Sequence, residues 1–224
     1  RLSQVLQARG IRCVILAPAE NEAETNEMDW TPFTVVSLEP PALDARLPHA
    51  GLSHYNNVLR CWHELSYRGI TRVGFISRGD SHEFTQGQGL AAHAYQQSRC
   101  CPPHDRIPDL NLSADTPADQ LCTWLQTHRP VAVISSEPIH PLLPKTSRLK
   151  PPDQFSYVSL DVLSEEAADV SGIDPGMDRL GETVVETLNQ LQQRGLTGQA
   201  PSPVGTQITG IWRDGSTLAE PVVL

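Results

Sequence analysis

The chain has 224 residues, of which 39% are hydrophobic and 19% are charged, and its net charge is −9. The length allows one large domain or two lobes of about 100 residues each. The acidic balance excludes an electrostatic footprint for the phosphate backbone of nucleic acids, and no apolar run approaches the roughly 20 residues of a membrane span.

The first predicted unit is a helix followed by a strand. Leu2, Val5 and Leu6 share one helical face, Gly10 ends the helix, and Ile11 to Leu16 is an apolar run typical of a buried strand. The same pattern returns at residues 58–77, so that RGIRCVIL near the start is matched by RGITRVGFI further on. In both copies the glycine supplies a left-handed helix end.

The other predicted elements also alternate between strands and helices. Strands are predicted at 34–38, 131–134, 157–160 and 207–212, and helices at 85–98, 119–127 and 177–193. The proline-rich stretches 39–51 and 137–153 are predicted to be irregular loops. Continuous apolar strands that alternate with helices indicate a doubly wound α/β fold with parallel sheet covered on two faces.

Three patterns with possible chemistry are weak here. GQGLAA (87–92) has the loose form of a dinucleotide fingerprint, but the nearest strand ends about ten residues earlier, so no nucleotide cofactor is predicted. Cys100, Cys101 and His104 lack a fourth ligand, so no metal site is predicted. No set of nucleophile, base and orienting acid can be selected, so no catalytic residue is predicted.

The five cysteines bear on the cellular compartment. Their odd number and irregular spacing argue against a disulfide framework, and a reducing cytoplasm is therefore favoured.

Asp161 is the first candidate binding residue, because it ends the strand FSYVSLD. It could be a turn or helix-capping aspartate, or a carboxylate at the carboxyl edge of a parallel sheet, where ligands of α/β proteins bind. Ser37, Gln88 and Glu137 also lie at or near predicted strand ends. Such neutral and acidic groups suit a sugar-like ligand, since hydroxyl groups both donate and accept hydrogen bonds.

Taken in order, these segments resemble the effector-binding domain of Lac repressor-type transcriptional regulators, which share the fold of periplasmic sugar-binding proteins. The segments that carry the resemblance are LQARGIRCVILAP, TPFTVVSLE, GLSHYNNVLRCWHELSYRGITRVGFIS, HRPVAVISSEP, FSYVSLD, SGIDPGMDRLGETVVETLNQL and GIWRDGSTL. They span nearly the whole chain.

The resemblance implies two lobes with a hinge and an effector in the cleft between them. The N-terminal lobe would comprise 1–51 and 174–203, and the C-terminal lobe 52–173 and 204–218, with a tail at 219–224. It also implies a homodimer and operator DNA bound by a separate N-terminal helix-turn-helix headpiece. That headpiece and the first β-α-β stretch of the N-terminal lobe are absent from the sequence.

Some positions depart from the family pattern. Gln88 falls where the family commonly has a sugar-gripping arginine, and Glu137 falls in place of an Asn-Asp pair. Ser37 takes the place of an aspartate, whereas the cleft-facing aspartate is kept as Asp161. Two other classes remain open: a periplasmic solute-binding protein, which an encoded signal peptide would identify, and an α/β enzyme.

Overall fold

The computed structural model of the chain describes residues 2–18, 28–39, 46–78, 87–113, 115–136, 138–143, 150–162, 169–200 and 202–219. The chain forms two compact units. Unit 1 comprises Arg1–Ser53 and Gly176–Ile208, and unit 2 comprises His54–Pro175 and Thr209–Leu224. No helix in the described part of the chain is long and apolar enough to cross a membrane.

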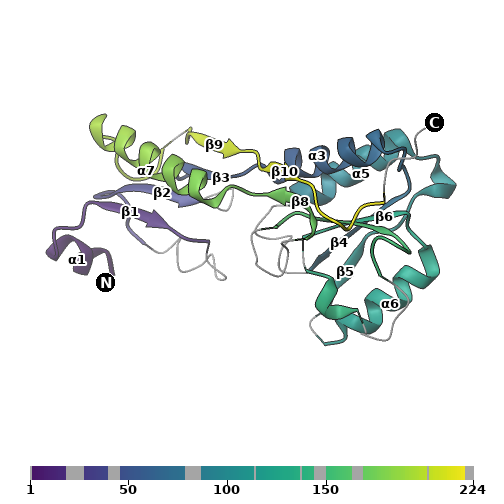
Figure 1. Ribbon diagram of the computed structural model, residues 1–224. Coiled ribbons are helices and arrows are strands. Elements are labelled where there is room, and N and C mark those ends of the chain that lie inside the picture. Colours follow the sequence, from purple (N-terminus) through teal and green to yellow (C-terminus); the bar gives the residue numbers. More distant parts are fainter. Residues whose placement is uncertain are drawn as a thin grey trace. The chain divides into compact units, whose positions relative to one another are not determined.

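Unit 1 is built on a four-stranded parallel sheet with the order β1-β2-β3-β9. Its elements are α1 (Leu2–Ala8), β1 (Cys13–Leu16), β2 (Thr34–Leu38), β3 (His49–Leu52), α7 (Met177–Gln193) and β9 (Gly205–Ile208). Figure 1 shows α7 lying along one face of this sheet, where Leu180, Val184 and Leu191 pack against Val36 and Ala50. On the other face, Val35 packs in a second apolar cluster to which α1 contributes one leucine.

Unit 2 is built on a six-stranded sheet with the order β10-β8-β7-β6-β4-β5, parallel except for β10. Its strands are β4 (Val73–Arg78), β5 (Leu110–Leu112), β6 (Ala132–Ser135), β7 (Ser156–Ser159), β8 (Ser171–Asp174) and β10 (Ile211–Arg213). Its helices are α3 (His54–Tyr67), α5 (Gln88–Cys100), α6 (Pro117–His128) and the short 3₁₀ turns η1 (Pro103–Asp105) and η2 (His140–Leu142).

Both faces of the unit 2 sheet are covered. Ala132 and Ile134 of β6 pack beneath α3 and α5, while Val133 between them packs in the cluster of α6, and Figure 1 shows α3 and α5 side by side, away from α6. Because both faces are buried, the central strands are apolar throughout rather than alternating. The predicted doubly wound α/β fold class is therefore confirmed.

Three strands and one break differ from the sequence-based expectations. Strand β3 lies at the end of the stretch 39–51 that was expected to be a loop, and β5 and β8 were not predicted. The expected strand 207–212 is two strands, β9 and β10, with Thr209 and Gly210 between them. Strand β9 pairs with β3, so residues 205–208 lie in unit 1, whereas 204–218 were expected in the second lobe.

Three of the described α-helices end at a left-handed glycine, and of the other two, α5 is followed by Cys101 in an extended conformation. Helices α1, α3 and α7 are followed by Gly10, Gly69 and Gly195, each in the left-handed region, which glycine enters without steric cost. Helix α6 is instead capped by Arg129, whose φ is 46°. A side chain at this conformation is uncommon.

Candidate functional site

The carboxyl edge of the unit 2 sheet contains a topological switch point. In chain order β4 is followed by β5 on one side, and β6 then returns to the opposite side of β4. The connections therefore leave β4 and β6 toward opposite faces, and ligands of open α/β sheets bind at the carboxyl ends of such a strand pair. The candidate site is thus the ends of β4 and β6, together with the neighbouring end of β7.

Polar groups gather at these strand ends. Arg78 is the last residue of β4, and Ser136 follows β6 directly. The Ser136 backbone N–H donates to Ile76 O (3.1 Å). Its hydroxyl oxygen is buried and has no hydrogen-bond partner among the described residues. Because a buried hydroxyl without a partner is costly, Ser136 is a polar group at this edge that a ligand hydroxyl would satisfy.

Asp161 lies just beyond the end of β7 and is exposed. A local turn fixes its backbone: the Ser159 hydroxyl donates to Asp161 O (2.7 Å), and the Asp161 N–H donates back to the same hydroxyl oxygen (3.1 Å). The next residue, Val162, is buried and donates its N–H to Ile173 O (3.1 Å). The backbone at Asp161 is therefore held between two anchored residues. Its placement in a cleft stays a prediction.

The other three predicted site residues have different surroundings. Gln88 is the first residue of α5 and is half-buried, which places it in the connection that follows β4. Ser37 is buried in β2 of unit 1, where its hydroxyl donates to Leu38 O (3.3 Å). Glu137 lies outside the described residues.

In unit 1, a carboxylate sits at the same kind of edge. Glu39 follows β2 with a φ of 66°, and its Oε1 accepts the N–H of Leu52 at the end of β3 (2.9 Å). The close approach requires Gly51, because a Cβ there would lie 2.6 Å from Glu39 Oε2. Glu39 thus brings a negative charge to the carboxyl edge of the unit 1 sheet.

A buried polar network anchors α5, the helix that begins at Gln88. Trp62 Nε1 donates to His93 Nδ1 (3.2 Å), and His93 Nε2 lies 3.3 Å from Asp109 Oδ1. Since Nδ1 accepts, the neutral ring carries its proton on Nε2. Nε2 also lies 3.1 Å from the Gln97 amide nitrogen, which is a donor, so the carboxylate is the neighbour that can accept this proton. Burial lowers the pKa of His93 to about 4 and raises the pKa of Asp109 to about 6. The imidazole is therefore neutral at pH 7.

Two residues of this site escaped sequence reasoning. Arg78 extends β4 one residue past the segment 58–77 in which this strand was predicted, and no role was predicted for Ser136, which directly follows β6. Their importance depends on the strand order, which places β4 beside β6. The signal that could have indicated Ser136 is its position directly after the apolar run VAVIS.

The fold and this edge define a class of protein: two α/β units, each built on a mainly parallel sheet, with a polar carboxyl edge of the kind at which ligands bind. Comparison with models of known protein families gave no match, and comparison with curated proteins gave none either. Solved structures do match. The Lactose Repressor bound to the anti-inducer ONPF has a TM-score of 0.72 and 15% identity, and the match covers 97% of this chain and 82% of that one.

Two further similar structures are regulators of the same type. A LacI family transcriptional regulator from Enterococcus faecium with bound ribose gives a TM-score of 0.65 at 14% identity, covering 99% of this chain and 84% of that one. A periplasmic binding protein/LacI transcriptional regulator from Alkaliphilus metalliredigens QYMF, complexed with D-xylulofuranose, gives 0.66 at 13%, covering 97% and 81%. The chain therefore has the fold of the LacI-type effector-binding domain, as its sequence motifs predicted.

Proposed function

We propose that this chain is the ligand-sensing core of a DNA-binding transcriptional regulator of the LacI type. A small, sugar-like effector binds in the cleft between the two units and contacts the carboxyl edges of both sheets. The observation that carries this proposal is the polar edge at the switch point of unit 2, where the buried Ser136 hydroxyl has no partner among the described residues. Hydroxyl-rich ligands supply both the donor and the acceptor that such an edge requires.

The predicted residues have distinct roles in this proposal. Asp161 accepts hydrogen bonds from ligand hydroxyl groups. Gln88 offers a neutral amide at the position where the family commonly has an arginine. Glu39 is a better candidate than Ser37 on the unit 1 side, because the Ser37 hydroxyl is buried and donates to a backbone carbonyl. Glu137 completes the set beside Ser136.

The regulatory step is a coupling of two equilibria. The effector shifts the arrangement of the two units only by the difference in its affinity for the two states. In a cytoplasmic homodimer this shift changes the spacing of two helix-turn-helix headpieces, which would bind operator DNA and are not among these 224 residues. The acidic charge of −9 suits a core that does not itself touch phosphates.

A sugar-binding assay tests the effector site. A panel of pentoses, hexoses and disaccharides at millimolar concentration is screened for stabilisation of the chain against heat, and hits are titrated calorimetrically. Asp161→Asn should weaken binding about 10-fold or more, because the charge-assisted hydrogen bond is lost. Asp153→Asn, at the opposite end of β7, is the matched control and should leave binding unchanged.

Two results would count against the proposal. Equal losses of affinity in the Asp161 and Asp153 variants would contradict the proposal that Asp161 contacts the effector. An encoded signal peptide in place of a headpiece would indicate an exported solute-binding protein instead of a regulator. Specific operator binding by the longer protein, altered by the sugar that binds the core, is the result expected for a regulator.

A further inference from the structure

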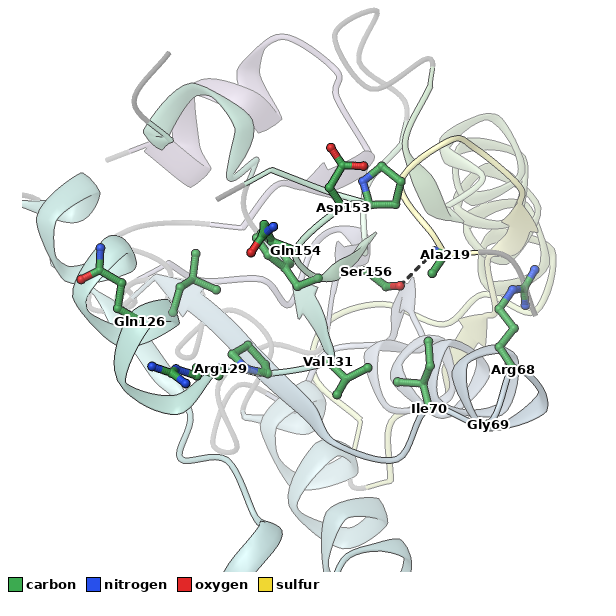
Figure 2. A pocket seen from close by; sticks show the side chains of 14 residues that line it. Arg68, Gly69, Ile70, Gln126, Arg129, Val131, Asp153, Gln154, Ser156 and Ala219 are labelled. Atoms are coloured by element: carbon green, nitrogen blue, oxygen red, sulfur yellow. Dashed lines mark hydrogen bonds between the residues drawn. The ribbon is translucent and has the colours of Figure 1, made fainter. Parts of the chain in front are cut away.

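A cavity lies in unit 2 at the amino end of its sheet. It has a volume of about 770 Å³. Its lining comes from the residues at the starts of β6 and β7 and from those at the ends of α3 and α6. Figure 2 shows Val131 and Ile70 on one side and Gln154 on the other. The carboxyl edge with Ser136 is at the opposite end of the same strands, so this cavity is separate from the proposed effector site.

The cavity presents apolar surface to solvent. Val131 keeps 48% of its surface exposed although it directly precedes the buried strand β6. Leu125, Ile70 and Phe155, which are buried members of the core, also line the cavity. The rest of the lining is mixed, with six polar side chains beside these apolar ones: Arg68, Gln126, Arg129, Asp153, Gln154 and Ser156. The volume is in the range of small-molecule sites.

Arg129 is the polar group that distinguishes the cavity. It holds the left-handed position that glycine occupies after α1, α3 and α7, so the chain accepts backbone strain to place a side chain here. The guanidinium is exposed and makes no hydrogen bond or ion pair with any described residue. Strain of this kind is concentrated at functional sites.

The other charged residues on the lining are less free to bind an anion. Arg68 already contacts Glu64 Oε2 (3.3 Å) and Asp214 Oδ1 (3.2 Å). Asp153 is exposed, and Figure 2 shows it on the side of the cavity away from Arg129. Gln126 and Gln154 add amide groups that can donate hydrogen bonds. Arg129 is therefore the cation available to a ligand.

We propose that this cavity binds a small organic carboxylate with an apolar body, of the size of hexanoate or benzoate. The carboxylate forms a two-pronged hydrogen-bonded pair with the Arg129 guanidinium, a geometry that suits the planar donors of arginine. The apolar body lies over Val131 and Leu125, and the amides of Gln126 and Gln154 flank the headgroup. This makes the cavity a second ligand site, independent of whether the carboxyl edge binds a sugar.

Calorimetric titration of the full 224-residue chain with hexanoate and benzoate tests the site. Their neutral counterparts, hexanamide and benzamide, measure the contribution of charge, and sodium sulfate measures binding of an anion without an apolar body. Arg129→Gly should weaken carboxylate binding at least about 10-fold, and it keeps the left-handed backbone that the fold requires. Arg129→Lys should bind the carboxylate more tightly than Arg129→Gly but more weakly than the unchanged chain, because an ammonium cannot pair with both carboxylate oxygens as the planar guanidinium does.

The matched control is Arg12→Gln. Arg12 lines a smaller cavity of about 430 Å³ at the amino ends of the unit 1 strands, and its replacement removes the same charge without affecting carboxylate binding. Equal binding of the acids and their amides, or an equal loss in the Arg12 and Arg129 variants, would overturn the proposal. Binding that appears only after residues 220–224 are deleted would also overturn it, because the chain itself would then be the occupant.

Discussion

The two sheets differ in how deeply they bury strands of similar sequence. RGIRCVIL leads into β1 and RGITRVGFI into β4, yet every residue from Val73 to Ser77 is buried in β4, whereas no residue of β1 is buried. Ile15, within β1, keeps 44% of its surface exposed. Strand β1 has a neighbour on one side only in the described sheet, while β4 lies between β5 and β6. Position in the sheet, more than strand sequence, sets the degree of burial.

The largest expected effect compares one isoleucine from each sheet. Ile134→Ala, in the fully buried β6, should lower the free energy of unfolding by about 2–5 kcal/mol, because it leaves a cavity under α3 and α5. Ile15→Ala should cost less than about 1 kcal/mol, because the side chain is already half exposed. Chemical denaturation followed by tryptophan fluorescence measures both, and equal losses would contradict the difference between the sheets.

The second prediction concerns the buried network of Trp62, His93 and Asp109 in unit 2. Between pH 6.5 and 4 the unfolded chain protonates His93 while the folded chain does not, so His93 destabilises the fold as the pH falls through this range. The gap between about 4 and the ordinary pKa of 6.5 corresponds to at most about 3 kcal/mol. Asp109 acts oppositely: its raised pKa makes the folded form bind the extra proton as the pH falls through 6.

The contributions of His93 and Asp109 to the pH dependence of the unfolding free energy therefore offset each other in the unchanged protein. Asp109→Asn removes the second contribution and leaves that of His93. We expect the free energy of unfolding of this variant to fall more steeply than that of the unchanged protein between pH 6.5 and 4. Urea denaturation at several pH values measures the slopes. Asp115→Asn, which changes an exposed aspartate of the same unit, is the control and should follow the unchanged protein; identical slopes for all three would remove the coupling.

The sequence was sufficient where a strand or helix carries its own pattern. The continuous apolar runs predicted β1, β2, β4, β6 and β7, and the long stripe of leucine and valine predicted α7 with the bounds that it has. Strands β3, β5 and β8, with the sequences HAGL, LNL and SGID, have no such run. They are strands because they pair with neighbours that are distant in sequence, which a local pattern does not contain.

The candidate site was predictable to the same extent. Asp161 was selected because it ends an apolar run, which needs only local information, and its role in binding stays a prediction. The role of Ser136 needs the order of β4 and β6 in the sheet, and Arg129 needs the backbone conformation at the end of α6. Sequence spacing alone does not supply either of these.

The third prediction compares close approaches in the two sheets. Gly74→Ala in β4 would overlap the ring of Trp124 from α6, and a packed aromatic ring cannot move aside, so a loss of about 1–3 kcal/mol in unfolding free energy is expected. Gly51→Ala in β3 meets the Glu39 carboxylate, which can rotate away and lose its bond to Leu52 at a cost of about 1 kcal/mol. The new Cβ also lies 3.0 Å from the Glu39 Cα, which has to shift by a few tenths of an ångström. A larger loss for Gly51→Ala, measured by denaturation, would reverse the comparison.

The smallest expected effect exchanges the helix ends of the two units. Arg129→Gly should raise the free energy of unfolding by about 0.5–1 kcal/mol, because glycine adopts the left-handed backbone conformation without steric strain. The gain is reduced because glycine also gives the unfolded chain more conformational entropy. Gly195→Arg, at the end of α7 where nothing lies near the glycine, should lower it by a similar amount. If Arg129→Gly is instead destabilising, Arg129 makes folded-state contacts that offset its strain, and the strain cannot be assigned to ligand binding. A gain in stability together with a loss of carboxylate affinity is the result that assigns the strain to the cavity.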